Sequence, residues 1–192
     1  MKRVGDTVGG RYVALLRGIN VGRAKRVSMA DLRALFADLG YGDVHTLLNS
    51  GNVVFSGPDV EPGGATAAAP GAAARIEAAL AQRLGVSARV TVLTAAELAT
   101  IVAGNALLEV AGDHSRLLVA VLADPADRAR LEPLTEQDWA PEALALGVRV
   151  AYMWCPDGVI ASRLSAAVGR LLGDAVTARN WATMTKLHAL TE

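Results

Sequence analysis

Residues 11–27 read Arg-Tyr-Val-Ala-Leu-Leu-Arg-Gly-Ile-Asn-Val-Gly-Arg-Ala-Lys-Arg-Val, and this stretch decides the fold prediction for the first half of the chain. The run from Tyr12 to Leu16 is apolar at every position, which is typical of a strand that is buried on both faces of a sheet. The run stops at Arg17, and the loop that follows contains two glycines and several basic residues. Because glycine lets a backbone approach a ligand closely, a basic loop of this kind can bind an anion.

The rest of the first half predicts a ferredoxin-like unit. We expect a helix from Ser28 to Gly40, a hairpin of Val44–Leu48 and Val53–Phe55 around Asn49–Asn52, a helix at Ile76–Leu84 and a strand at Val86–Leu93. With the strand at Tyr12–Arg17, the order is β-α-β-β-α-β, which is the order of the split βαβ unit. Residues 58–74 are rich in Pro, Gly, Ala and Thr, and we expect a flexible low-complexity insertion there.

The second half predicts a near echo of the first. We expect a helix from Thr94, a strand at Leu117–Leu122, helices at Ala126–Leu134 and Pro141–Leu146, a hairpin of Val148–Trp154 and Val159–Ala161, and helices at Ser162–Leu172 and Trp181–Leu190. The predicted fold is therefore α/β (α+β). It has two ferredoxin-like βαββα(β) halves packed side by side, residues 11–93 and 94–192, with antiparallel or mixed sheets and helices on one face.

Composition restricts the class of protein. A chain of 192 residues with 52% apolar residues can bury a core and suits one domain or two small ones. The single cysteine, Cys155, excludes a disulfide framework and fits a reducing cytosol. No secretory leader and no apolar run of about 18 residues is present, so we expect a cytoplasmic protein without a membrane partner. The three histidines lie far apart in the sequence, and we expect no metal and no cofactor.

The charge distribution favours a local anion site over general binding of polyanions. The 19 basic and 19 acidic residues give a net charge of zero, which disfavours nucleic acid as a partner. Residues 1–57 carry eight Lys/Arg against four Asp/Glu, whereas residues 94–142 carry three against nine. The two ends of the chain are basic. Either these charges are scattered over solvated faces or the two ends meet at one site.

No known catalytic or nucleotide-binding motif is matched. Gly18–Lys25 has the wrong spacing for a P-loop, and no Gly-x-Gly-x-x-Gly sequence follows a predicted strand. The aromatic content is only 4%, and Tyr12 and Phe55 are the aromatic residues of the predicted central strands, which disfavours base stacking on the sheet. Ser50 lies in Asn-Ser-Gly-Asn, which is typical of a turn and not of a nucleophilic serine. Whether the protein is an enzyme stays open.

The segment Thr177–Lys186 places polar residues in front of an apolar helix face. Asn180 is a good N-cap residue, so Arg179 is expected just outside the amino end of the last helix. One interpretation is a packed terminal helix with a capped start. The other is that Arg179, Asn180 and Thr183 help to line a pocket together with the Arg17 loop.

The leading functional hypothesis is a protein that binds a small ligand with a phosphate or carboxylate group. We expect a cleft between the Arg17–Arg26 loop, the Asn49–Asn52 turn and the Arg179–Lys186 segment. The candidate ligand-binding residues are Arg17, Gly18, Asn20, Gly22, Lys25, Asn49, Ser50, Asn52, Arg179, Asn180 and Thr183. The alternative is a non-catalytic interaction or structural module. A weaker alternative is nucleic-acid binding through the basic loop. The sequence leaves the oligomeric state open.

Several motifs in fixed order resemble a known bacterial family. These are Ala14–Gly22, Met29–Leu35, Asn49–Phe55, Pro156–Gly158, and Thr177–Trp181 with Thr185–Leu187. They resemble the family called domain of unknown function 1697, over nearly all of residues 11–190. The resemblance implies an α/β fold built from related ferredoxin-like parts. It implies no activity, substrate or catalytic residue.

Overall fold

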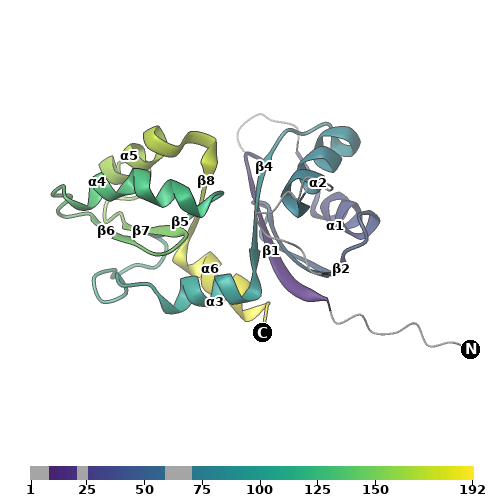
Figure 1. Cartoon of the computed structure of the whole chain (residues 1–192), viewed down its shortest axis with the longest axis horizontal. Helices are drawn as coiled ribbons and strands as arrows, with labels where there is room; N and C mark the ends of the chain where they lie inside the picture. Colours follow the sequence, from purple (N-terminus) through teal and green to yellow (C-terminus); the bar gives the residue numbers. More distant parts are fainter. Residues whose placement is uncertain (1–8, 21–25, 59–70) are drawn as a thin grey trace, which may run out of the picture. The chain divides into compact units, whose positions relative to one another are not determined.

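The structure is a computed structural model that describes residues 9–20, 26–58 and 71–192. The chain divides into two compact units, Met1–Ala95 with Thr191 and Ala96–Leu190 with Glu192. Each unit contains one four-stranded antiparallel sheet (Figure 1).

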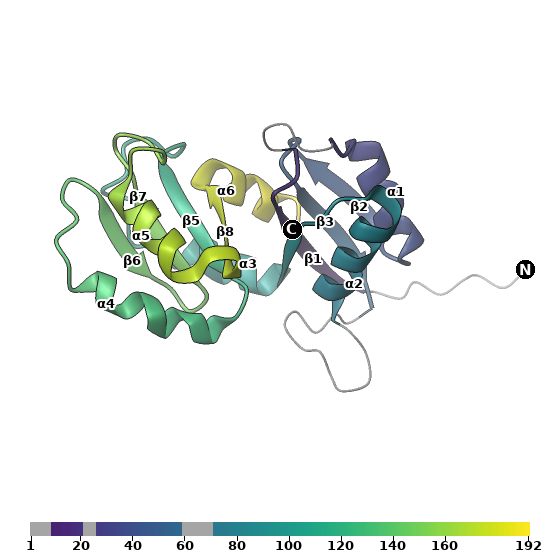
Figure 2. The same cartoon turned by 90° about the horizontal axis from the view of Figure 1, so that it is seen from above.

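The first unit has the predicted β-α-β-β-α-β order. Its elements are β1 (Gly10–Arg17), α1 (Met29–Asp38), β2 (Gly42–Leu47), β3 (Asn52–Gly57), α2 (Ala72–Ala79), a π-helical turn η1 (Leu80–Leu84) and β4 (Arg89–Thr94). The strand order is β2-β3-β1-β4, so the predicted central strand is an inner strand. Helices α1 and α2 cover one face of this sheet (Figure 2).

Local sequence signals explain where the first helix begins and ends. The Ser28 hydroxyl accepts the backbone N–H of Asp31 at 3.0 Å, which satisfies one of the amides that the first helical turn leaves open. Gly40 follows the helix with φ at +88°, a conformation that glycine adopts at little cost. Leu32, Leu35 and Phe36 lie between these signals and pack onto the sheet. The prediction of this helix is confirmed.

The second unit repeats the same order of elements after one additional helix. Its elements are α3 (Ala95–Ala103), β5 (Leu117–Leu122), the 3-10 helix η2 (Pro125–Leu131), α4 (Glu132–Thr135), β6 (Ala143–Leu146), β7 (Val150–Trp154), α5 (Arg163–Leu172), the 3-10 turn η3 (Gly173–Ala175), β8 (Val176–Asn180) and α6 (Trp181–Ala189). The strand order is β6-β7-β5-β8. Helices α4 and α5 pack on one face of the sheet, and α3 and α6 lie on the other (Figure 1).

Three predictions for the second half are wrong. Residues 141–146 were expected to be helical, but Ala143–Leu146 forms the edge strand β6, which pairs with β7. The expected strand at Val159–Ala161 is a turn, because the hairpin partner of β7 is β6. Strand β8 was missed, since its apolar part is short and ends in polar residues. In each case the pairing of strands overrides the local sequence preference.

Two predictions for the first half also need correction. Residues 72–74 were expected within a flexible insertion, but they form the first turn of α2, and Ala72 is buried. Alanine is the best helix former, so low sequence complexity hides a helix start here. Residues 59–70 of that insertion lie outside the described residues. The fourth strand begins at Arg89, three residues later than expected, because Val86–Ala88 makes no ladder pairs.

A glycine in the β2–β3 turn offers a test of this packing. Gly51 has φ at +76°, and a Cβ atom placed on it would lie 2.7 Å from Leu16 Cβ. Gly40 also has positive φ but has open space where a Cβ would lie. We expect Gly51→Ala to lower the free energy of unfolding by about 2–3 kcal/mol and Gly40→Ala by about 1 kcal/mol. Urea denaturation of the two variants checks this, and equal losses would contradict the close contact.

The carboxylate that precedes β6 makes stability depend on pH. Burial raises the pKa of Glu142, but hydrogen bonds from Ser162, Leu164 and Arg163 lower it more, so the folded pKa lies below the usual 4.5. A depressed pKa stabilises the fold above the unfolded-state pKa, and this contribution is lost as the pH falls through the folded-state pKa. We expect Glu142→Gln to cost about 1–2 kcal/mol at pH 7 and less below pH about 4.

Urea denaturation at several pH values measures this difference. Glu136→Gln is the control, because Glu136 is an exposed carboxylate in the same unit. A destabilisation by Glu142→Gln that stays constant down to pH about 3 would show that ionisation of this carboxyl group is not responsible.

Candidate functional site

Two of the predicted site segments lie together at one end of the first sheet. The loop after β1 leaves the sheet at Arg17, next to the β2–β3 turn. The Leu16 amide donates to the Gly51 carbonyl at 2.8 Å, which joins the end of β1 to that turn. The start of β4 lies on the other side of β1. The end of the first sheet therefore brings the Arg17 loop and the Asn49–Asn52 turn into contact.

The side chain of Asn20 ties this loop to the turn. Its Nδ2 donates to the carbonyl of Asn49 and to the carbonyl of Val27, both at 3.0 Å. Its Oδ1 accepts the Val27 amide at 2.7 Å. An asparagine amide has two N–H donors, and both are used within the protein. Asn20 therefore holds the loop in place. The predicted site residues Gly22 and Lys25 lie outside the described residues.

The turn contains one internal and two exposed polar side chains. Asn52 is fully buried, and its Nδ2 donates to the Leu47 carbonyl and to Ser50 Oγ, both at 3.0 Å. These bonds close the turn, so both N–H donors of Asn52 are also used internally. Asn49 and Ser50 are exposed. Of the polar side chains in this turn, these two can face a ligand.

Two arginines lie opposite each other at this end of the sheet. In the antiparallel ladder between β1 and β4, Arg17 pairs with Arg89. Like charges directly opposite on neighbouring strands destabilise a sheet. Glu77 lies 3.5 Å from the Arg89 guanidinium and offsets part of this charge. Arg89 was not among the predicted site residues, because the strand was expected to start at Val86 and the register of the ladder was not known.

The second unit contains the other predicted site residues. Arg179 Nη1 donates to Thr177 Oγ1 at 3.0 Å and to the Ala178 carbonyl at 2.8 Å. Burial lowers the pKa of Arg179 to about 10, so its guanidinium stays charged at neutral pH. Asn180 Oδ1 accepts the amide and the hydroxyl of Thr183, which caps α6. We expected these residues to share a cleft with Arg17, but Arg17 belongs to the other unit. This expectation stays a prediction.

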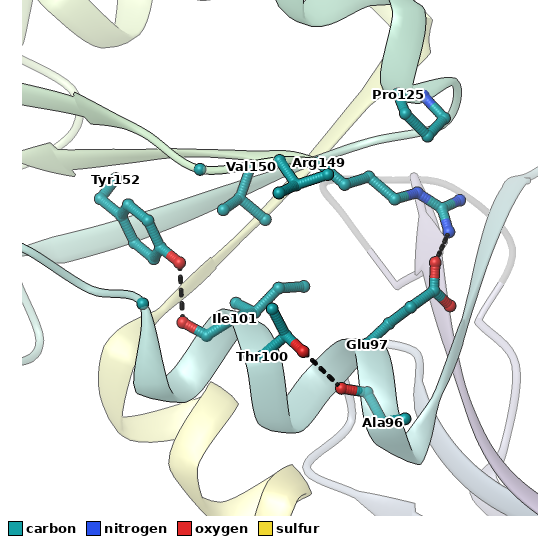
Figure 3. Close-up of a pocket in the computed structure, with 11 residues that line it drawn as sticks. Ala96, Glu97, Thr100, Ile101, Pro125, Arg149, Val150 and Tyr152 are labelled. Atoms are coloured by element: carbon teal, nitrogen blue, oxygen red, sulfur yellow. Dashed lines mark hydrogen bonds and ion pairs between the residues drawn. The ribbon is translucent and has the colours of Figure 1, made fainter.

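The second unit also contains a cavity that the sequence analysis did not predict. It has a volume of about 390 Å³ and lies between α3 and β7 (Figure 3). Arg149 and Glu97 form an ion pair of 2.8 Å at one end, and Tyr152 lies at the other. The single sequence signal for this site was Arg149, a charged residue inside the predicted apolar strand Val148–Trp154.

Other chemically active side chains are enclosed. Cys155 is fully buried, and burial raises the pKa of its thiol. Tyr12 and Phe55 stack on each other within the core of the first unit, so their rings are not exposed for base stacking. Within the described ranges, no three His, Cys, Asp or Glu side chains gather where they could hold a metal ion. Among these same residues, no helix is both long and apolar enough to cross a membrane.

The asparagine that ties the loop allows a direct test. We expect Asn20→Ala to lower the free energy of unfolding by about 2–3 kcal/mol, because three hydrogen bonds are lost. The Val27 amide should exchange with solvent faster in this variant. Native-state hydrogen exchange and urea denaturation measure both effects. Asn49→Ala is the control, since Asn49 takes part in this junction through its backbone carbonyl only. Unchanged exchange at Val27 in Asn20→Ala would contradict the assignment.

Comparison with known proteins gives the fold and the family. The structure resembles a solved structure of a conserved bacterial protein from Streptococcus pneumoniae, with a TM-score of 0.75 and 21% sequence identity over 95% of this chain and 99% of that one. At this identity the likeness shows the fold alone. None of the curated proteins matches the chain. The family model described as protein of unknown function (DUF1697) matches residues 10–152. The chain therefore belongs to the DUF1697 family.

Proposed function

We propose that this protein binds a small ligand with a phosphate or carboxylate group at the end of β1 in its first unit. The observation that carries the proposal is the pairing of Arg17 with Arg89 across β1 and β4. Two guanidinium groups on neighbouring strands repel each other, and Glu77 offsets part of this charge at Arg89, so a bound anion would lower the remaining repulsion. Arginine also donates to phosphate and carboxylate oxygens through two parallel N–H groups.

The fold itself does not require charge at these positions. The second unit has the same topology, and its β5–β8 ladder ends with Leu122 opposite Val176. Both of these side chains are buried and apolar. An apolar pair therefore satisfies the same position in the same fold. Folding therefore does not require the arginine pair of the first unit, and binding of an anion would account for it.

Polar side chains beside the arginines can add directional hydrogen bonds to a ligand. Asn49 and Ser50 are exposed in the turn that adjoins the Arg17 loop, and their side chains can donate to ligand oxygens. The Asn20 bonds hold the loop and the turn together before a ligand binds, which lowers the cost of ordering the site. The residues at this site suit recognition, and a general base or nucleophile is not among them.

Binding of inorganic pyrophosphate tests the proposal. We expect Arg17→Ala and Arg89→Ala each to weaken binding about tenfold or more, because each removes charge-assisted hydrogen bonds worth about 1.5–3 kcal/mol. Arg33→Ala is the matched control, since Arg33 is an exposed arginine of the same unit that donates to Thr46. Isothermal titration calorimetry at low and physiological salt measures the affinities.

The alternative is a non-catalytic interaction or structural module, and one observation favours it. The side-chain amides of Asn20 and Asn52 and the side-chain oxygen of Asn180 all make bonds within the protein. These residues then serve turns and caps. Equal pyrophosphate affinity in Arg17→Ala and Arg33→Ala, or no saturable binding to the unsubstituted protein, would favour this alternative. Submicromolar, sequence-dependent binding of RNA at physiological salt would favour the nucleic-acid hypothesis instead.

A further inference from the structure

The cavity between α3 and β7 in the second unit has the size of a small-molecule site. Its volume is about 390 Å³, and small-molecule sites commonly enclose about 300–1,000 Å³. Helix α3 forms one wall with Ala96, Thr100 and Ile101, and β7 forms the other with Val150 and Tyr152 (Figure 3). Ala96, Thr100 and Val148 of this lining are exposed, so the space opens to solvent and a ligand can enter it.

The walls of the cavity present hydrocarbon, because their hydroxyl groups are already bonded. The Thr100 hydroxyl donates to the Ala96 carbonyl at 2.9 Å, and the Tyr152 hydroxyl donates to the Ile101 carbonyl at 2.7 Å. Burial raises the pKa of Tyr152 to about 12, so this hydroxyl stays neutral. Because these walls offer few hydrogen-bond partners, an apolar ligand gains free energy by covering their hydrocarbon from water. An apolar occupant fits the cavity better than water does.

One charged side chain at the end of the cavity retains donors. Arg149 is only 7% exposed, and three of its N–H groups donate to the Leu122 carbonyl, the Ala123 carbonyl and the Glu97 carboxylate. A guanidinium has five N–H donors, so two of those on Arg149 have no acceptor among the described residues. Arg149 Nη1 and Nη2 each make one bond within the protein, so each has one N–H group left to donate. A ligand oxygen at this end of the cavity would supply the missing acceptor.

The charge of the ion pair selects the kind of oxygen. Glu97 lies 2.8 Å from Arg149 and neutralises it. A second carboxylate in the same place would be repelled by the charge of Glu97. A carbonyl oxygen accepts from a guanidinium without this repulsion. The site therefore favours a neutral acceptor over an anionic one.

We propose that the cavity lined by α3 and β7 binds an uncharged, mainly apolar small molecule that presents one carbonyl oxygen to Arg149. Its apolar part lies between Ile101 and Val150, and its oxygen lies beside the Arg149–Glu97 pair. This site belongs to the second unit and is independent of the proposed anion site in the first. The two sites differ in chemistry, so a ligand of one does not suit the other.

Three probes of similar size test the proposal: acetophenone, ethylbenzene and benzoate. Titration of the isotopically labelled full-length chain by NMR should shift the amides of Ile101, Gly147 and Val150 with acetophenone. Ethylbenzene lacks the acceptor oxygen, and we expect it to bind about tenfold more weakly. Benzoate carries a charge and should also bind at least about tenfold more weakly. Ethylbenzene or benzoate binding as tightly as acetophenone would overturn the proposed role of the carbonyl group.

A blocking variant locates the binding. Thr100→Trp places a large side chain in the cavity and should weaken acetophenone binding about tenfold or more. Ala166→Trp is the control, because Ala166 is exposed on α5, which packs on the other face of the sheet. If Thr100→Trp fails to fold, Ala96→Phe serves the same purpose on an exposed position of α3. Unchanged affinity in a folded blocking variant, or no saturable shifts with any probe, would overturn the proposal.

Discussion

Burial of one strand on both of its faces governs each unit. The five residues Tyr12–Leu16 are at most 4% exposed, and the six residues Leu117–Leu122 are at most 8% exposed. A strand of this kind must lie inside its sheet, where both rows of backbone hydrogen bonds are satisfied by neighbouring strands. Its side chains then serve the core, and polar chemistry is left to the residues where the strand ends. The Arg17–Arg89 pair lies at the end of β1, and the Arg149–Glu97 pair lies at the end of β5.

Local signals of the sequence predicted most of the first unit, but not where α2 and β4 begin. The apolar run, the Ser28 cap, the glycine after α1 and the turn at Asn49–Asn52 each act within a few residues, and each is confirmed. The direction of a polar side chain is different, because it depends on contacts between distant residues. Asn20 reaches Asn49, 29 residues away. An asparagine in a loop therefore indicates a polar contact, but the sequence does not tell whether its partner is a ligand or the backbone.

The errors in the second unit also come from contacts between residues that are distant in the sequence. Residues 141–146, Pro-Glu-Ala-Leu-Ala-Leu, consist largely of good helix formers with proline at the first position, yet Ala143–Leu146 forms a strand. Intrinsic propensity amounts to a few tenths of a kcal/mol per residue, roughly, and pairing with β7 exceeds it. The Arg17–Arg89 pair was hidden for a related reason. The sequence contains both residues, but only the register of the β1–β4 ladder places them opposite each other.

The two units use one junction in two different ways. In the first unit, the Leu16 amide donates to the Gly51 carbonyl, and the Asn20 side chain joins the loop after β1 to the β2–β3 turn. In the second unit, the Leu122 amide donates to the Arg149 backbone carbonyl at the equivalent place in the topology. There the side-chain bond runs in the opposite direction, because the Arg149 side chain reaches from the turn to the carbonyls of Leu122 and Ala123.

The two junctions differ in where their charge lies. In the first unit the side chain that joins loop and turn is the uncharged Asn20, and the charged residues Arg17 and Arg89 are exposed. In the second unit this side chain is Arg149, which is buried and paired with Glu97, and the apolar cavity lies beside it. Each unit therefore has a side-chain bond at this junction, but an asparagine makes it in the first unit and an arginine makes it in the second, so the two candidate sites differ in polarity.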